Sequence, residues 1–311
     1  MTPRNPSSAA STGAIRLGTR GSALALWQAR TVAGLLEAQG RKVELVTIKT
    51  HGDRIQDRPL SETGGKNLFV KEIEEALLAR EVDVAVHSGK DMSVVVPPGL
   101  GIAAVLPRED SRDALVLAIG AGPLREDAAI GTGSVRRSAQ LARRMPRARF
   151  LPMRGNVDTR LRKLDAGEFD ALVLAVAGLK RLGHGDRISE AISHDDCVPA
   201  PCQGIVAIET RAEDVDDPVW AAINDVQARA AFDAERAVVE GLGGGCQLPL
   251  GAIAVHDGTD LVLQGIVTSP DGARSVRGTV RGTARSPVEL GRQLAQYLAG
   301  EGALDILNSL R

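Results

Sequence analysis

The chain has very few aromatic residues, with two Trp, one Tyr and four Phe among its 311 residues. Its cores must therefore be built from Ala, Val, Leu and Ile, which dominate the 43% of residues that are hydrophobic. A formal net charge of −1 argues against a protein that binds nucleic acid through its overall charge.

Cysteine is scarcer still, with three residues. Cys197, Cys202 and Cys246 are too few and too scattered for a disulfide framework, which favours a reducing compartment. His194 lies near the first two, but the spacing lacks a CxxC pair and a fourth ligand. We therefore predict no metal site.

Long apolar runs are missing as well. No stretch approaches the roughly 18 apolar residues that a membrane span needs. Residues 1–14 are rich in Ser, Pro and small residues and lack the apolar region of a secretory signal. We expect 1–14 to be a disordered lead-in and the protein to be cytoplasmic.

What the chain does contain is an alternation of strand-like and helix-like patterns through its first two-thirds. This rhythm predicts βαβ units and mostly parallel sheets. The last third has one helical pattern over 218–240, three strand-like segments and a final helical pattern over 288–306. It predicts a separate α+β unit, in keeping with a length that suggests two or three domains.

Two strand-to-helix turns carry arginines. In Gly131–Arg137 a short strand precedes the helix, whose free N–H groups and dipole favour an anion, and Arg136 and Arg137 add forked donors suited to carboxylates. Arg154–Arg160 repeats this arrangement. Successive turns of this kind lie at one edge of a sheet, where open α/β folds bind ligands. The alternative is a helix cap with solvated surface arginines.

Two further segments carry side chains suited to binding a substrate or forming a covalent bond. Ser88-Gly89-Lys90-Asp91 follows an apolar strand, and Lys90 favours the ionised form of Asp91, so the carboxylate can hold a cationic or N–H-bearing substrate. Gly243-Gly244-Gly245-Cys246 leaves room beside a thiol that can serve as a covalent anchor. The alternatives are a surface turn with a local ion pair and a buried, inert cysteine.

Taken together and in order, these segments resemble the porphobilinogen deaminase family over about 15–306. The turn Gly18–Ser22, the segment Gly64–Glu72 and Leu174–Arg181 extend the resemblance. It implies two α/β domains like periplasmic-binding-protein lobes, joined by two crossovers, and a small α+β domain. The implied boundaries are 1–14 for the lead-in, 15–104 with 204–222 for domain 1, 105–203 for domain 2, and 223–311 for domain 3.

The resemblance also implies a function. The family joins four porphobilinogen molecules into hydroxymethylbilane with release of ammonia, in tetrapyrrole and heme biosynthesis. Its dipyrromethane cofactor is bound by a thioether, here to Cys246. Asp91 matches the catalytic aspartate, which stabilises the azafulvenium cation left when ammonia departs. Lys66 and Phe69 match a mobile active-site loop. The matching partners of substrate and cofactor carboxylates are Arg20, Ser22, Lys90, Ser134, Arg136, Arg137, Arg154, Arg160 and Arg181.

The sequence departs from the family pattern at four positions: Gly89 replaces Met or Leu, Gly133 replaces Ser, Cys202 replaces Gly, and Glu62 replaces a Lys found in some members. None of these removes a charged catalytic group. We expect a monomer that binds porphobilinogen and neither nucleic acid nor membrane. A non-catalytic polyanion-binding protein and a basic-patch nucleic-acid protein remain as alternatives, although the basic segment 131–163 holds a single aromatic residue, Phe150, for base stacking.

Overall fold

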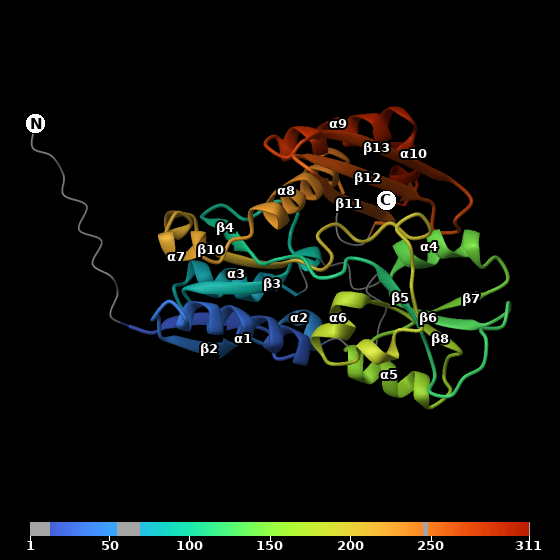
Figure 1. Cartoon of the computed structure of the whole chain (residues 1–311), viewed down its shortest axis with the longest axis horizontal. Helices are drawn as coiled ribbons and strands as arrows, with labels where there is room; N and C mark the ends of the chain where they lie inside the picture. Colours follow the sequence, from blue (N-terminus) through green and yellow to red (C-terminus); the bar gives the residue numbers. More distant parts are fainter. Residues whose placement is uncertain (1–12, 55–68, 245–247, 311) are drawn as a thin grey trace, which may run out of the picture.

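A computed structural model describes residues 13–54, 69–244 and 248–310. Their helices and strands form three groups, each built around its own sheet (Figure 1). Two groups lie side by side in the lower half of the view, and the C-terminal group lies above them. The predicted architecture of two α/β units, two crossovers and a smaller α+β unit is confirmed.

The first sheet has the strand order β2-β1-β3-β10-β4. Helix α1 (Ala23–Glu37) buries Ala29, Val32 and Leu36 against one face, and α3 (Lys71–Leu78) buries Ile73 and Leu77 against the other. The short helices α2 (His51–Arg54) and α7 (Pro218–Ala221) belong to the same group. The strands are β1 (Ile15–Thr19), β2 (Val43–Thr47), β3 (Val84–Ser88), β4 (Leu100–Val105) and β10 (Val206–Arg211).

The second sheet has the order β7-β6-β8-β5-β9. Its strands are β5 (Asp113–Leu117), β6 (Ala129–Thr132), β7 (Arg149–Pro152), β8 (Ala171–Ala175) and β9 (Glu190–Ala191). Helices α4 (Val135–Arg144), α5 (Val157–Asp165) and α6 (Val176–Arg181) pack around it. The helices α4, α5 and α6 each begin within a few residues of the end of a strand, so their N-termini lie at one edge of the sheet.

The prediction of mostly parallel sheets is wrong for half of the pairings described in these two sheets. Strand β1 runs parallel to β2 and β3, and β6 runs parallel to β7 and β8. Strand β10 is antiparallel to β3 and β4, and β5 is antiparallel to β8 and β9. The reason is that β5 and β10 each follow a crossover, so they enter their sheets without the helical connection that would make them parallel to a neighbour.

The third group is an antiparallel meander covered by helices. Strands β11 (Leu250–Asp257), β12 (Asp260–Thr268) and β13 (Ser275–Thr283) pair in chain order. Helices α8 (Val226–Gly241), α9 (Pro287–Gly300) and α10 (Ala303–Asn308) pack on them around a core of Val238, Leu263 and Leu294.

Two long helical predictions are wrong in the same way. The pattern over 218–240 is divided between α7 and α8, because Asp225 accepts a hydrogen bond from Ala228 N (2.7 Å) and starts a new helix. The pattern over 288–306 is divided between α9 and α10 at Gly302, whose φ of +93° ends a helix.

A buried carboxylate fixes the third group to both crossovers. Glu235 of α8 pairs with Arg108 of the outgoing crossover, at 2.5 Å from Oε1 to Nη1, and accepts a hydrogen bond from Cys202 N of the return crossover (2.6 Å). It also accepts one from Ala254 N in β11 (2.7 Å). Within the described ranges, no helix has both the length and the apolar character needed to cross a membrane.

Candidate functional site

Asp91 lies in a short turn at the end of β3. The 3-10 helix Gly89–Asp91 follows Ser88 directly, and Gly89 N donates to Ile205 O of the return crossover (2.9 Å). A Cβ on Gly89 would lie 3.0 Å from Cys202 Cβ and 3.1 Å from the Phe232 ring. Since so little space is left, a larger side chain than glycine at this position would displace the turn that carries Asp91.

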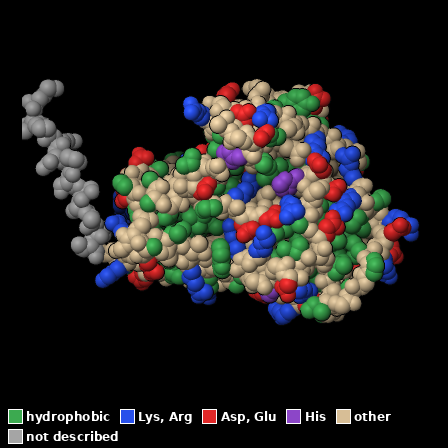
Figure 2. Space-filling model, viewed as in Figure 1, with side chains coloured by type: hydrophobic (Ala, Val, Ile, Leu, Met, Phe, Trp, Pro, Cys, Tyr) green, Lys and Arg blue, Asp and Glu red, His purple; other side chains and the backbone are tan. Residues whose placement is uncertain are grey.

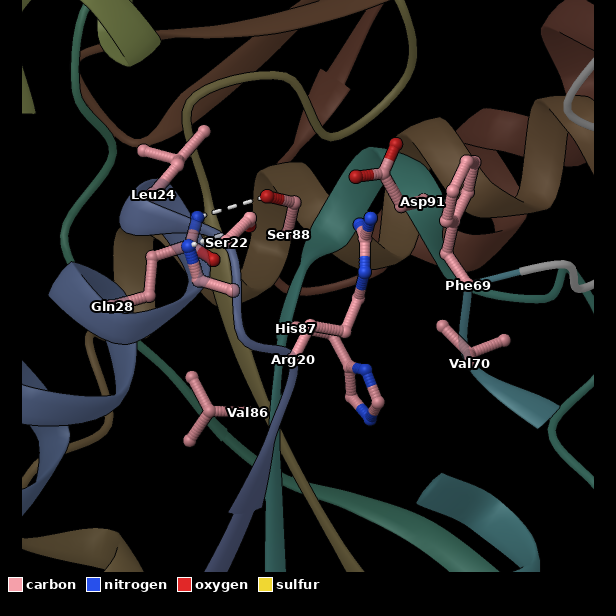
Figure 3. Close-up of a pocket in the computed structure, with 11 residues that line it drawn as sticks. Arg20, Ser22, Leu24, Gln28, Phe69, Val70, Val86, His87, Ser88 and Asp91 are labelled. Atoms are coloured by element: carbon pink, nitrogen blue, oxygen red, sulfur yellow. Dashed lines mark hydrogen bonds between the residues drawn. The ribbon is translucent and has the colours of Figure 1, made fainter. Parts of the chain in front are cut away.

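A pocket opens beside this turn (Figure 3). The Arg20 guanidinium points toward Asp91 and stacks on Phe69, with 4.2 Å from Arg20 Cζ to the ring centroid. Ser22 caps α1 by accepting from Ala25 N (3.3 Å). The pocket is lined by Arg20, Ser22, Leu24, Ala25, Gln28, Phe69, Val70, Val86, His87, Ser88 and Asp91.

Behind the pocket lies a buried polar group. His87 Nε2 is 3.1 Å from Glu209 Oε2, and both side chains are almost wholly inaccessible. The register of β10 shifts between Ile208 and Glu209, as in a β-bulge, which re-aims a side chain at this point of the sheet. Desolvation, followed by the charge of Glu209, raises the pKa of the neighbouring Glu74.

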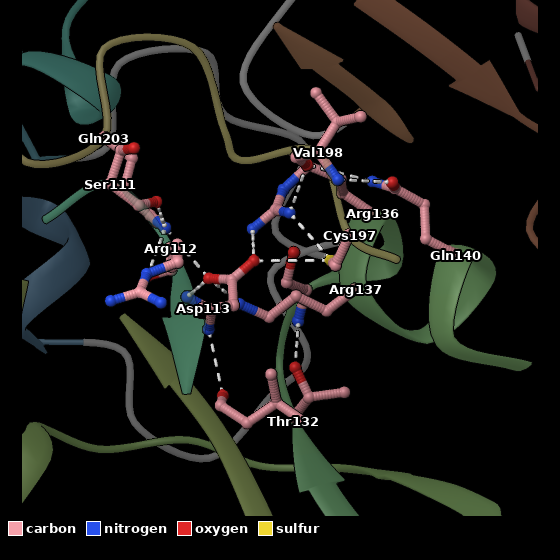
Figure 4. Close-up of polar contacts among 12 residues, drawn as sticks. Ser111, Arg112, Asp113, Thr132, Arg136, Arg137, Gln140, Cys197, Val198 and Gln203 are labelled. Atoms are coloured by element: carbon pink, nitrogen blue, oxygen red, sulfur yellow. Dashed lines mark hydrogen bonds and ion pairs between the residues drawn. The ribbon is translucent and has the colours of Figure 1, made fainter. Parts of the chain in front are cut away.

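A second charged group lies across the site and is almost fully buried (Figure 4). Asp113 pairs with Arg136 Nη2 through Oδ2 (2.8 Å) and with Arg137 Nη2 through Oδ1 (2.7 Å). Burial alone would raise the pKa of Asp113, but the two guanidinium groups outweigh it and hold that pKa well below its usual range. Arg136 and Arg137 therefore already have an internal carboxylate partner.

Burial and neighbouring charges lower the pKa values of two further cations, Lys90 and Arg160. Desolvation lowers the pKa of Lys90 to about 8, against the attraction of Asp91 and with a further lowering by Arg137. Desolvation, then Arg137 and Arg154, lowers the pKa of Arg160 to about 10, while Asp91 opposes the change. The charges of Asp91 and Arg137 thus act on both Lys90 and Arg160, and Arg154 adds its positive charge at Arg160.

The loop before α5 places Arg154 and Arg160. Gly155 has φ +111°, and Asn156 caps α5 by accepting from Thr159 N (2.9 Å). Arg160 Nε donates to Gly155 O (2.8 Å), which fixes the guanidinium over the turn. Of the four arginines in the two strand-to-helix turns, Arg136 and Arg137 are bound to Asp113, and Arg160 is held by the loop before its own helix.

The remaining predicted residues have different surroundings. Arg181 donates to Gly204 O (2.6 Å) and lies over Trp27, at 5.3 Å from its ring centroid, so it ties α6 to the return crossover and to α1. Ser134 precedes α4 and its N–H donates to Thr132 Oγ1 (3.2 Å). Cys246, Lys66 and Glu62 lie outside the described residues, as do residues 1–12 of the predicted lead-in.

Two residues of the site were missed by the sequence analysis. Asp113 pairs with both buried arginines, and Gln203 donates to Asp113 Oδ1 (2.9 Å) while accepting from Lys90 Nζ (3.3 Å). Asp113 opens a strand immediately after Arg112, so it looks like an ordinary surface pair in the sequence. Only the return of the chain through the second crossover places Gln203 beside it.

Three of the four departures from the family pattern lie among the described residues. A Cβ on Gly133 would lie 2.6 Å from Met153 O, so this backbone approach requires glycine. Cys202 occupies the space beside Gly89, with a φ of +63° that is unusual for a residue with a side chain. The departures at 89 and 202 are therefore in contact with each other.

On the face shown in Figure 2, Lys and Arg side chains alternate with Asp and Glu where the three groups of elements meet. No cluster of three or more His, Cys, Asp or Glu in the described ranges could hold a metal ion. The arrangement offers one carboxylate to a cation or an N–H donor, and several cations to carboxylates. The fold and site thus define a three-part α/β protein whose site is chemically suited to an anionic small molecule bearing polar N–H or cationic groups.

The chain belongs to the porphobilinogen deaminase family. The family described as "Porphobilinogen deaminase, dipyromethane cofactor binding domain" matches residues 15–217, and "Porphobilinogen deaminase, C-terminal domain" matches 230–300. A protein of Acidithiobacillus ferrooxidans named porphobilinogen deaminase is 46% identical over 302 residues, covering 96% of this chain and 98% of that protein. One of the same name from Trichlorobacter lovleyi is 44% identical over 300 residues, covering 95% and 96%.

Solved structures resemble the chain more distantly. A substrate-binding domain of a putative amino acid ABC transporter from Streptococcus pneumoniae has a TM-score of 0.43 at 12% identity, covering 74% of this chain and 95% of that one. The periplasmic aliphatic sulphonate binding protein of Escherichia coli has a TM-score of 0.41 at 10% identity, covering 73% and 70%. At these TM-scores, nothing about the fold or function of this chain rests on the resemblance.

Proposed function

We propose that this protein joins four porphobilinogen molecules head to tail into hydroxymethylbilane, with release of ammonia. The observation that supports this most directly is that Asp91 and Arg20 line one pocket and that the charge of Asp91 acts on Lys90 and Arg160, on a chain of this family. The substrate carries acidic side chains, a pyrrole N–H and an aminomethyl group. Cations suit the first, and a carboxylate suits the other two.

Asp91 is proposed as the catalytic residue. Positive charge develops on the pyrrole when ammonia leaves, and a fixed carboxylate stabilises that charge without reorganising. The turn Gly89–Asp91 is held by Gly89 N to Ile205 O and packed against Cys202, so the carboxylate is pre-positioned on a rigid strand end. Asp91 lines the pocket and is half-buried, so it is accessible to a ligand.

The acidic groups of substrate and cofactor are proposed to bind the cations around Asp91. Arg20, Lys90, Arg154 and Arg160 are half-buried, so part of each side chain stays accessible to a carboxylate. Arg136 and Arg137 are shared with Asp113 and contribute positive potential through their fixed positions. Ser22, Ser134 and Arg181 complete the proposed set, and Phe69 with Lys66 forms the proposed active-site loop.

The dipyrromethane cofactor fits these residues, because its pyrrole N–H groups suit Asp91 and its carboxylates suit Arg and Lys. We propose that a thioether to Cys246 holds it, in the segment between α8 and β11 whose described ends are Gly244 and Leu248. When bound, it supplies a nucleophilic pyrrole carbon as the starting point of the growing chain. Residues of the two sheets would then hold and orient it.

The domain boundaries, the oligomeric state and the cellular location are also proposed. We propose the domain boundaries 15–104 with 204–222, 105–203 and 223–311, which follow the membership of strands in the three sheets except at Val105, the last residue of β4 in the first sheet. We propose a monomer, because the site is built from a single chain. We propose a cytoplasmic location, where a thiol at Cys246 stays reduced.

Intact mass tests the proposal directly. The purified chain should carry a covalent dipyrrole, and peptide mapping should place it on Cys246. Cys246→Ser should lose both the adduct and essentially all bilane formation, while Cys197→Ser keeps the adduct. An adduct on Cys197 or Cys202, or an unmodified chain that turns over porphobilinogen, would contradict it.

A further inference from the structure

Gln203 connects the two charged groups of the site. It lies in the return crossover, between β9 and β10, and is 1% exposed. Its Nε2 donates to Ser111 O (2.8 Å) and to Asp113 Oδ1 (2.9 Å), and its Oε1 accepts from Lys90 Nζ (3.3 Å). Both ends of one buried amide are therefore in use.

The chemistry of the partners fixes the orientation of this amide. The carbonyl of Ser111 and the carboxylate of Asp113 only accept hydrogen bonds, whereas the Lys90 ammonium only donates. A flipped amide would place its oxygen against two acceptors and its NH2 against an ammonium. The neutral glutamine side chain satisfies both sides at once, which neither a glutamate nor a methionine can do.

These contacts join parts of the chain that are far apart in sequence. Lys90 is in the turn after β3 of the first sheet, and Asp113 opens β5 of the second sheet. The backbone around Gln203 is tied to the outgoing crossover and to the Asp91 turn, because Gln203 O accepts from Arg108 Nε (2.9 Å) and Ile205 O accepts from Gly89 N (2.9 Å). The amide thus spans the junction between the Asp91 turn and the arginines that Asp113 holds.

We propose that Gln203 is a positioning residue, whose amide sets the distance between the Lys90–Asp91 turn and the Asp113–Arg136–Arg137 group so that both act on the same substrate. The proposal rests on the proposed function above. Gln203 does not itself touch the pocket that Asp91 lines; it acts through Lys90 on one side and Asp113 on the other.

Gln203→Met, compared with Gln140→Met, tests this role. Gln140 is also a buried glutamine with both amide ends bonded, to Val198 N (2.8 Å) and Val198 O (3.1 Å), but it contacts neither Lys90 nor Asp113. Both variants should lower Tm. Gln203→Met should also lower kcat on the order of 10- to 100-fold with a smaller change in KM, because misplaced groups cost rate. Gln140→Met should keep kcat within about twofold.

A second variant keeps the test decisive if Gln203→Met does not fold. Gln203→Glu retains an acceptor for Lys90 but places a carboxylate beside Asp113. It should lower kcat and move the alkaline limb of the kcat–pH profile to higher pH, since the added charge raises the pKa of Lys90 above about 8. Unchanged kcat and an unchanged limb would overturn the proposal.

The wild-type chain is assayed first with porphobilinogen. Failure to form bilane overturns the proposed function, and this inference with it. Turnover by the wild type, together with a kcat in Gln203→Met that equals the kcat of Gln140→Met, overturns the positioning role alone.

Discussion

The two charged groups of the site use the same residue types in opposite ways. Asp113 is wholly buried, and its two arginines are 4% and 6% exposed, so their charges are satisfied within the protein. Asp91 and Arg20 are half-buried, line a pocket and face a space that a ligand can enter. The difference shows that an arginine's place in a motif does not decide its role: burial with an internal partner makes it part of the frame, and access makes it a binding group.

The largest loss of stability should come from removing the charge of Asp113, the internal partner of Arg136 and Arg137. Asp113→Asn keeps the shape of the side chain but leaves two buried guanidinium groups without a counter-charge. Breaking a buried pair in this way costs about 3–5 kcal/mol. We expect a large fall in the free energy of unfolding, measured by chemical denaturation, together with loss of activity. An unfolding free energy equal to that of the wild type would show that Arg136 and Arg137 do not depend on Asp113. The difference drawn here between these two arginines and Arg20 would then be wrong.

Asp91→Asn should show the reverse pattern. Loss of the charge should lower kcat by a factor on the order of 10²–10³, because charge stabilisation acts most strongly in the transition state. Tm should stay near that of the wild type, because Asp91 is half-buried at the end of a strand. Kinetics on protein shown by mass to carry its cofactor provide the measurement. A collapse in Tm with normal kcat would instead assign Asp91 to a local ion pair.

The sequence predicted those strands and helices whose apolar periodicity is local. Strand β3 leading into Asp91 and helix α5 after Arg154 are examples. Strand direction at β5 and β10 could not be read in this way, since it depends on the crossovers. The ion pairs of Arg136 and Arg137 with Asp113 could not be predicted from the sequence either. Asp113 is more than twenty residues away in the chain, and only the order of strands in the sheet brings it next to the two arginines.

A smaller effect is expected at the contact between Gly89 and Cys202, which supports the Asp91 side of the site. Gly89→Ala places a Cβ at 3.0 Å from Cys202 Cβ, and such overpacking costs about 1–3 kcal/mol. Cys202→Gly removes that atom and suits the φ of +63°. The double variant should recover at least about 1 kcal/mol of the stability lost by Gly89→Ala, together with most of kcat.

A double-mutant cycle on unfolding free energy and kcat measures this coupling. If the two substitutions are additive, the Cys202 side chain does not determine where the Asp91 turn lies. Phe232, at 3.1 Å from the same position, then remains as the contact that limits the size of residue 89.

The smallest expected effect is on the pH dependence of stability. It comes from Lys90, which interacts with Asp91 on one side and, through Gln203, with Asp113 on the other. Desolvation lowers its pKa to about 8 from a usual 10.5. Below pH 8 the lysine is protonated in both the folded and unfolded chains, and the folded state bears the full cost of burying the charge. Between about pH 8 and 10.5 the folded chain loses this proton first, so the unfolded chain binds more protons and stability rises with pH.

Lys90→Met removes this titration. The variant loses the hydrogen bond to Gln203 at every pH, but its stability relative to the wild type should fall as pH rises from about 8 to 10.5, because only the wild type gains stability over that range. Because Lys90 is half-buried, solvent reduces the size of the effect, so the pH at which the difference changes is more informative than its magnitude. Denaturation midpoints of both proteins across this range provide the measurement. A difference that does not vary with pH would mean that Lys90 is as well solvated as an exposed lysine, and that the site around Asp91 is open to water on the Lys90 side.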